Sequence, residues 1–152
     1  MPEIQNLWPG ANPVTVRASA VLLGDSAYDA SPTEFSTANC SYITFYITYT
    51  RGGQGGAVSM HFEYSPRAAD AVGVENWFRM QCDGCETGQA GSDATVTLQR
   101  STVIYTSTGD GAENVVFGPI EFEGTVERMR VACSETGAAG KPGTVHIVAY
   151  MT

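Results

Sequence analysis

The stretch SYITFYITYT, residues 41–50, constrains the fold more than any other part of this chain. Its side chains are β-branched, aromatic or hydroxylated, and this composition favours a strand. The side chains alternate with period two, so the stretch predicts a β-strand that is buried on one face and amphipathic on the other. The face predicted to be buried consists of Ile43, Phe45, Ile47 and Tyr49, and the opposite face of Tyr42, Thr44, Tyr46 and Thr48.

Similar alternation recurs along the chain, and no segment shows a convincing amphipathic helix pattern. About eight short strands at this spacing predict an all-β fold, a single-domain jelly-roll or another Greek-key β-sandwich. The glycine-rich segment 51–56 lies between two predicted strands and indicates a hairpin turn. The predicted strands cover residues 14–23, 41–50, 58–64, 76–82, 94–100 and 101–107 (two strands or one long bent strand), 115–122, 126–133 and 144–151.

Residues 1–13 are predicted to form an extended arm in front of the β-sandwich domain of residues 14–152. Several prolines oppose a helix in this segment, and Leu7 and Trp8 are apolar without periodicity. A tryptophan side chain on such an arm is expected to occupy a pocket. The arm can fold back on its own sandwich or clasp a neighbouring subunit, and the sequence leaves both arrangements open.

Acidic residues outnumber basic residues by 16 to 8, which gives the chain a net charge of −8. Such a surface repels nucleic acid phosphates and anionic lipids, so neither nucleic acid nor membrane is an expected partner. The chain has no apolar run of about 18 residues and no basic region at its start, so we expect neither a transmembrane helix nor a leader. Synthesis in the cytoplasm then implies that Cys40, Cys82, Cys85 and Cys133 are reduced thiols.

The most conspicuous chemical motif is the pair Cys82 and Cys85, which are separated by two residues. Such a pair can bind zinc together with two further thiolates, form a disulfide after cell lysis, or act in redox catalysis at the start of a helix. Here the pair follows a predicted strand, and Cys40 and Cys133 are distant in the sequence. Structurally incidental thiols are therefore the main expectation, with the other three roles left open.

Other candidates for catalysis have simpler structural explanations. His61 and His146 alternate within predicted strands, as expected of histidines in a sheet. Glu121 and Glu123 could act as a carboxylate pair in glycoside hydrolysis, but positions two apart on a strand usually form a solvated face. The chain lacks G-x-S-x-G, H-E-x-x-H and G-x-G-x-x-G motifs, and the glycine-rich segment 51–56 lacks the lysine of a P-loop. We therefore expect no enzyme, no metal and no cofactor.

Two stretches carry a family resemblance, NLWPGANPVTVRAS at residues 6–19 and FGPIEFEGTVERMRVACSETGAAGKPGTVHIVAYM at residues 117–151. With them the chain resembles auxiliary virion proteins of tailed bacteriophages, in particular capsid decoration (cement) proteins. The likeness runs loosely over the whole chain, and the size and acidity of the chain fit it as well. The four cysteines are a departure, because such proteins do not generally depend on cysteine.

The resemblance implies a β-sandwich protomer, commonly a homotrimer, that sits on the capsid exterior and reinforces contacts between copies of the major capsid protein. It also implies a structural virion protein that is made in the host cytoplasm. Multivalent attachment to a lattice turns weak contacts into tight binding. The residues expected to contact partners are Leu7, Trp8 and Pro9 in the arm, with Arg17, Arg128 and Arg130 as polar contacts.

The alternative to a capsid protein is a carbohydrate-binding or receptor-binding module of the tail-fibre type. Aromatic side chains can form the floor of a sugar site, although core packing explains most of the aromatic residues in this chain. The candidates for such a site are Trp8, Trp77, Tyr28, Tyr42, Tyr46 and Tyr64.

Overall fold

A computed structural model of the chain describes residues 12–23, 27–66, 77–80, 87–90, 95–99, 102–121, 126–137 and 140–152. These residues form eleven strands and no helix. The number exceeds the predicted eight because residues 95–106 form two strands and because β2 and β6, only three and four residues long, were not predicted. The strands are β1 (Asn12–Val21), β2 (Glu34–Ser36), β3 (Tyr42–Thr50), β4 (Ala57–Ser65), β5 (Phe78–Arg79), β6 (Thr87–Ala90), β7 (Thr95–Gln99), β8 (Thr102–Thr106), β9 (Glu113–Glu121), β10 (Arg128–Thr136) and β11 (Thr144–Met151).

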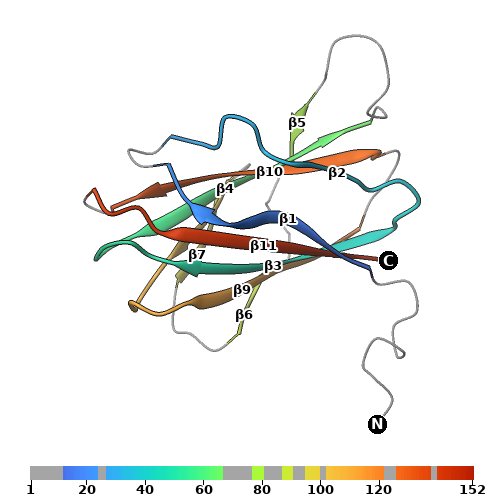
Figure 1. Ribbon diagram of the computed structural model, residues 1–152. Helices are drawn as coiled ribbons and strands as arrows, with labels where there is room; N and C mark the ends of the chain where they lie inside the picture. Colours follow the sequence, from blue (N-terminus) through green and yellow to red (C-terminus); the bar gives the residue numbers. More distant parts are fainter. Residues whose placement is uncertain are drawn as a thin grey trace.

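The strands form two antiparallel sheets that pack on each other as two layers (Figure 1). Sheet A has the strand order β1-β11-β3-β9-β6. Sheet B has the order β2-β10-β4-β8-β7, and β5 pairs with the end of β4 that β8 does not reach. Without the short strands β5 and β6 and the hairpin strand β7, this is the strand order of a jelly roll. The predicted all-β sandwich is confirmed.

The centre of sheet A consists of β3 and β11, which pair along their whole lengths. The predicted inward face of β3 is confirmed, because Ile43, Phe45 and Ile47 are fully buried. The last strand is apolar on both faces, which predicts a central position or a covered surface. It is central in the sheet, since β11 lies between β1 and β3.

The predicted hairpin at residues 51–56 is wrong. β3 belongs to sheet A and β4 to sheet B, so the glycine-rich segment carries the chain from one sheet to the other. Each strand has one apolar face, and facing the strands across the core buries both of these faces. Gly52 is needed at the crossing, because a Cβ atom there would overlap with the carbonyl oxygen of Lys141.

Several further boundaries differ from the prediction. Residues 95–99 and 102–106 form two strands paired with each other, so the single bent strand is excluded. β10 continues to Thr136, three residues beyond its predicted end. β1 begins at Asn12, and Pro13 pairs with Tyr150, so residues 12 and 13 belong to the sandwich and not to the arm.

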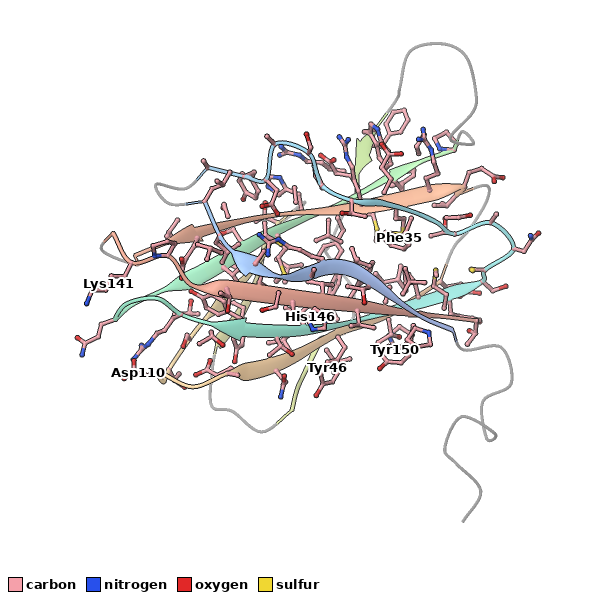
Figure 2. The ribbon with its side chains drawn as sticks, viewed as in Figure 1. Phe35, Tyr46, Asp110, Lys141, His146 and Tyr150 are labelled. Atoms are coloured by element: carbon pink, nitrogen blue, oxygen red, sulfur yellow. The ribbon has the colours of Figure 1, made fainter. Side chains whose placement is uncertain are left out.

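Phenylalanine side chains from both sheets meet in the middle of the core. Phe45 and Phe117 of sheet A both contact Phe62 of sheet B, with ring centroids 4.7 and 4.6 Å apart. Phe35 of β2 closes one edge, with its centroid 6.3 Å from that of Phe45 (Figure 2). Burying one such ring contributes about 1.5–3 kcal/mol relative to leaving it exposed. These contacts hold the two sheets together.

Candidate interaction face

The outward side of sheet A is built from alternate residues of β3, β9 and β11. Each of these positions except Tyr42, the first residue of β3, lies between neighbours that point into the core, because successive side chains of a strand point to opposite faces. We call this surface the tyrosine face. Its residues are Tyr42, Thr44, Tyr46, Thr48, Asn114, Val116, His146, Val148 and Tyr150.

The three tyrosines of this surface form a zigzag row across β3 and β11. Tyr46 and Tyr150 are diagonal neighbours in the register of β3 and β11, a relation that places side chains about 7–8 Å apart. Tyr42 lies opposite Thr152 and so adjoins Tyr150 in the same way. Tyr42 and Tyr150 each expose 44% of their surface. Figure 2 shows Tyr46, His146 and Tyr150 together over the central strands of sheet A.

No residue of the tyrosine face is Asp, Glu, Lys or Arg, although the chain has a net charge of −8. Glu121 marks its rim, where the carboxylate accepts a hydrogen bond from the Tyr42 hydroxyl at 3.3 Å. The Thr48 hydroxyl donates to the side-chain oxygen of Asn114 at 2.8 Å. Tyrosine is enriched and charged residues are depleted at the centres of protein interfaces. The composition of the tyrosine face is therefore that of a protein interface.

The outward side of sheet B is charged instead, and charges of opposite sign alternate from strand to strand. Arg130 Nε lies 2.6 Å from Glu63 Oε2, and Arg128 Nη1 lies 2.6 Å from Glu34 Oε2. These pairs join β10 to both of its neighbours. We call this surface the charge ladder, and its residues are Glu34, Glu63, Arg79, Arg128 and Arg130.

Trp77, which directly precedes β5, covers two arginines of the charge ladder. Its ring centroid lies 4.1 Å from the guanidinium carbon of Arg130 and 5.0 Å from that of Arg128. Cation–π contacts contribute about 0.5–2 kcal/mol each, depending on desolvation. The side chains of Arg128 and Arg130 are only 8% and 24% exposed. Their charges are therefore neutralised within the protomer.

Arg17 connects the two sheets at one edge of the sandwich. Its Nε and Nη2 donate to the two carboxylate oxygens of Asp29 at 3.0 and 3.1 Å, and its Nη1 donates to the Val145 carbonyl at 2.9 Å. Asp29 accepts a hydrogen bond from the backbone N–H of Cys133 in β10. Burial alone would lower the pKa of Arg17, but Asp29 raises it above its ordinary value. The contacts stabilise the charged guanidinium as a link between sheets.

His61 lies on the outward side of sheet B, against the ring of Tyr28. The two rings are stacked, with centroids 4.0 Å apart and an interplanar angle of 16°. Burial lowers the pKa of His61 below its ordinary value of 6.5, Arg79 lowers it further, and Glu63 opposes this shift. The fold therefore favours the neutral imidazole.

Glu135 is a buried carboxylate beside the loop that precedes β11, the loop whose Lys141 is labelled in Figure 2. It accepts hydrogen bonds from the Tyr49 hydroxyl and from the backbone N–H of Gly143, both at 2.6 Å. Burial and these contacts with Glu135 raise the pKa of Tyr49 above its ordinary range. The carboxylate thus ties the loop before β11 to the core.

Glu113 has a similar role at the start of β9. It accepts hydrogen bonds from the Tyr105 hydroxyl at 2.8 Å and from the backbone N–H groups of Gly109 and Thr108 at 2.8 and 3.1 Å. Burial alone would raise the pKa of Glu113, but the hydrogen bonds lower it below its ordinary value of 4.5. The two carboxylates are engaged in holding loops in place.

The residues predicted to contact partners have different outcomes. The structure places Arg128 and Arg130 together under Trp77, and Arg17 against Asp29. Of the proposed sugar-binding aromatics, Tyr42 and Tyr46 lie on the tyrosine face, while Tyr28, Tyr64 and Trp77 belong to sheet B or its cover, so they do not form one site. Their partner roles stay predictions. The candidates Leu7, Trp8, Pro9, Cys82, Cys85 and Glu123 lie outside the described residues.

Metal and thiol chemistry can be examined only where the structure describes the chain. Cys40 and Cys133 are free thiols, and burial raises the pKa of Cys133 to about 12. Across the described ranges, no cluster of three or more His, Cys, Asp or Glu side chains could hold a metal ion. The same ranges contain no helix long and apolar enough to cross a membrane.

The sequence prediction did not include Tyr150 and His146 among the partner-binding residues, although it expected their strand to be central or covered by a partner. The signal that could have identified them is the absence of charge, because residues 41–50 and 144–151 contain no Asp, Glu, Lys or Arg. Each segment by itself reads as an ordinary strand. The extended uncharged surface arises only when β3 and β11 pair.

The described residues define a class, a jelly-roll β-sandwich with one outer side that is charged and internally paired and one outer side whose central strands, β3 and β11, are uncharged. No protein-family model matches the chain, and neither the curated proteins nor the solved structures include a match.

Proposed function

We propose that this chain is a structural, non-enzymatic protein that acts through contacts with other proteins on the outside of a tailed-phage capsid. The observation that carries the proposal is the tyrosine face, an uncharged surface with interface composition on an acidic chain. The capsid setting comes from the resemblance of residues 6–19 and 117–151 to decoration proteins. Its partners are the major capsid protein and other copies of the chain, with a homotrimer as the expected assembly.

The positions of the ionic side chains support a structural role. Glu113 and Glu135 hold loops through tyrosine and backbone donors, and Arg17 links the two sheets. The arginines of the charge ladder are paired with carboxylates and covered by Trp77. These groups stabilise the protomer, which leaves the tyrosine face and the arm for binding.

The capsid contact is assigned to the arm, whose apolar residues are Leu7 and Trp8. β1 begins at Asn12, so a deletion through residue 12 would remove part of a strand that pairs with β11. Full-length Trp8→Ala is the cleaner variant, because it leaves the strand intact.

The proposal is tested by sedimenting capsids made from the major capsid protein of the same virus with added purified chain. We expect the parent chain to co-sediment at saturating stoichiometry and to raise the temperature at which the capsids disassemble. Trp8→Ala should bind at least about tenfold more weakly, which corresponds to about 1.4 kcal/mol. An exposed substitution on sheet B, Thr106→Ala, serves as the matched control. Absence of binding by the parent chain would refute the capsid role.

A second candidate function is binding of a neutral glycan on the same surface. The observation that favours it is the combination of three exposed or half-exposed tyrosine rings with threonine hydroxyls and the Asn114 amide. Screening the purified chain against neutral and acidic glycans decides between the two functions. Binding of neutral glycans that Tyr46→Ala abolishes, without capsid binding, would replace the capsid role.

A further inference from the structure

We infer that the tyrosine face is the surface through which this chain binds a second copy of itself. The inference rests on the proposed function, since it names the partner that occupies the surface carrying that proposal. Four properties of the described residues support it: the distribution of charge, the area of the surface, the position of its tyrosines and the rim contact of Glu121.

Charge distribution favours a second copy at this surface. Two copies with a net charge of −8 each repel one another, and the repulsion is smallest where they meet through surfaces without carboxylates. The tyrosine face is such a surface. Its rim carboxylate, Glu121, already accepts a hydrogen bond from Tyr42. On sheet B, by contrast, a second copy would meet the carboxylates of Glu34 and Glu63.

The area of the surface can be compared with that required for stable association. The three strands β11, β3 and β9 at a spacing of about 4.8 Å, and the nine residues of β3 at about 3.3 Å each, give roughly 430 Å². A standard interface buries about 800 Å² on each partner. The tyrosine face therefore supplies about half of an interface, and the surface around it must supply the rest.

The tyrosines are placed as anchors. Tyr46 lies over the central strands, and Tyr42 and Tyr150 lie toward one end, so the row runs from the centre of the surface to its rim. Rigid aromatic side chains near the centre of an interface carry much of its binding energy. In a dimer the surface meets its own equivalent, whereas in the expected homotrimer it meets a different surface of the neighbour. In both assemblies it joins the copies.

Sedimentation equilibrium of the full chain over a wide concentration range tests the inference. We expect the mass of the parent assembly to be at least twice the monomer mass of 16.1 kDa. Tyr46→Arg and Tyr150→Arg should each weaken self-association at least about tenfold, because each buries an unpaired charge at the contact. Thr106→Arg, which places the same charge at an exposed position on sheet B, should leave the association constant unchanged. Tyr46→Phe should retain most of the association.

The dependence on salt separates this contact from one made by arginines. If uncharged surfaces join two acidic copies, screening of their repulsion should tighten self-association about threefold or more between low and high ionic strength. A contact that depends on the charge ladder should weaken instead. Weakening by salt, together with insensitivity to Tyr46→Arg, would overturn the inference.

The remaining outcomes are also decisive. A parent chain that stays monomeric at all concentrations, or arginine variants that associate like the parent, would refute the inference. A monomer that still binds capsids would refute it while leaving the proposed function standing. A chain that self-associates without binding capsids would refute the proposed function and leave the inference standing. Circular dichroism and urea unfolding of each variant confirm that a loss of association is not a loss of fold.

Discussion

The two outer sides of this sandwich have the same architecture and opposite chemistry. In both sheets, alternate residues face a common core and the others face outward. On sheet B the outward residues include five charged side chains that pair with one another under Trp77. On sheet A the outward residues of the central strands are uncharged, and tyrosines are the largest of them.

The difference shows that a charged surface can have its contacts satisfied within the protomer. The ion pairs of the charge ladder satisfy one another within the protomer, and Trp77 and Tyr28 cover part of the sheet. The tyrosine face is chemically simpler but leaves aromatic surface exposed. Substitutions on sheet B should therefore change mainly stability, and substitutions on sheet A mainly association. Four experiments test this contrast, from the largest expected effect on stability to the smallest.

Trp77→Ala should have the largest effect. It removes the ring that covers Arg128 and Arg130 and should lower the free energy of unfolding by about 2–3 kcal/mol. Urea unfolding of parent and variant measures this difference. The matched substitution on the outward side of sheet A, Tyr46→Ala, should lower the free energy of unfolding by at most about 1 kcal/mol. Equal losses for the two variants would contradict the contrast between the sides.

Arg130→Met should have the next largest effect. It leaves Glu63 with only Arg79, whose Nε lies 3.9 Å from Glu63 Oε1, as its cationic neighbour among the described residues. Because a half-buried carboxylate loses its close partner, the free energy of unfolding measured with urea should fall by about 1–2 kcal/mol. The double variant with Glu63→Gln should recover part of the loss. A double variant as unstable as the sum of the two single variants would show that the pair is not coupled.

Stability should also depend on pH through His61. Its pKa in the folded state lies below the ordinary value of 6.5, so the unfolded chain binds more protons as the pH falls below 6.5. The contribution of the neutral ring to the free energy of unfolding is present above pH 6.5 and is lost as the pH falls through the folded pKa. Over this range the free energy of unfolding should change by at most about 1.4 kcal/mol per pH unit. His61→Phe keeps a ring against Tyr28 and should flatten this slope in urea midpoints. An unchanged slope would assign the pH dependence to another group.

Tyr150→Ser should have the smallest effect on stability. Its ring is exposed on the tyrosine face, so the free energy of unfolding should change by no more than about 0.5 kcal/mol at concentrations where the chain is monomeric. The same variant should associate more weakly in sedimentation equilibrium. A large loss of stability in the monomer would mean that this ring supports the protomer and not an interface.

Period-two alternation predicted burial well, because it reports directly which side chains share a face. It identified the buried residues of β3, which are Ile43, Phe45, Ile47 and Tyr49. It failed for the connection at residues 51–56, because two strands that face each other across a core show the same pattern as two strands that pair. In β1, register shifts around Arg17 break the alternation, so Ala18 and Ala20 are exposed while Val16 is buried.

The candidate interface was harder to predict for a related reason. The three arginines predicted as polar contacts looked available in the sequence, since ion pairs such as Arg128 with Glu34 join residues far apart in the chain. The uncharged character of β3 and β11 was visible, but their adjacency was not. The sequence therefore shows which residues of the two outer sides are charged and which are uncharged. Only the strand order shows which of these residues share a surface.

The central place of β11 in sheet A has a consequence for synthesis of the protein. The ribosome makes this strand after all the others, yet β1 and β3 both pair with it. Until Met151 has emerged, β1 has no partner strand among the described residues, and β3 has one open edge next to its tyrosines. Sheet A therefore cannot be completed while the nascent chain is still growing toward residue 151. A product that stops short of β11 lacks His146, Val148 and Tyr150 and so cannot present the surface that we propose for self-association.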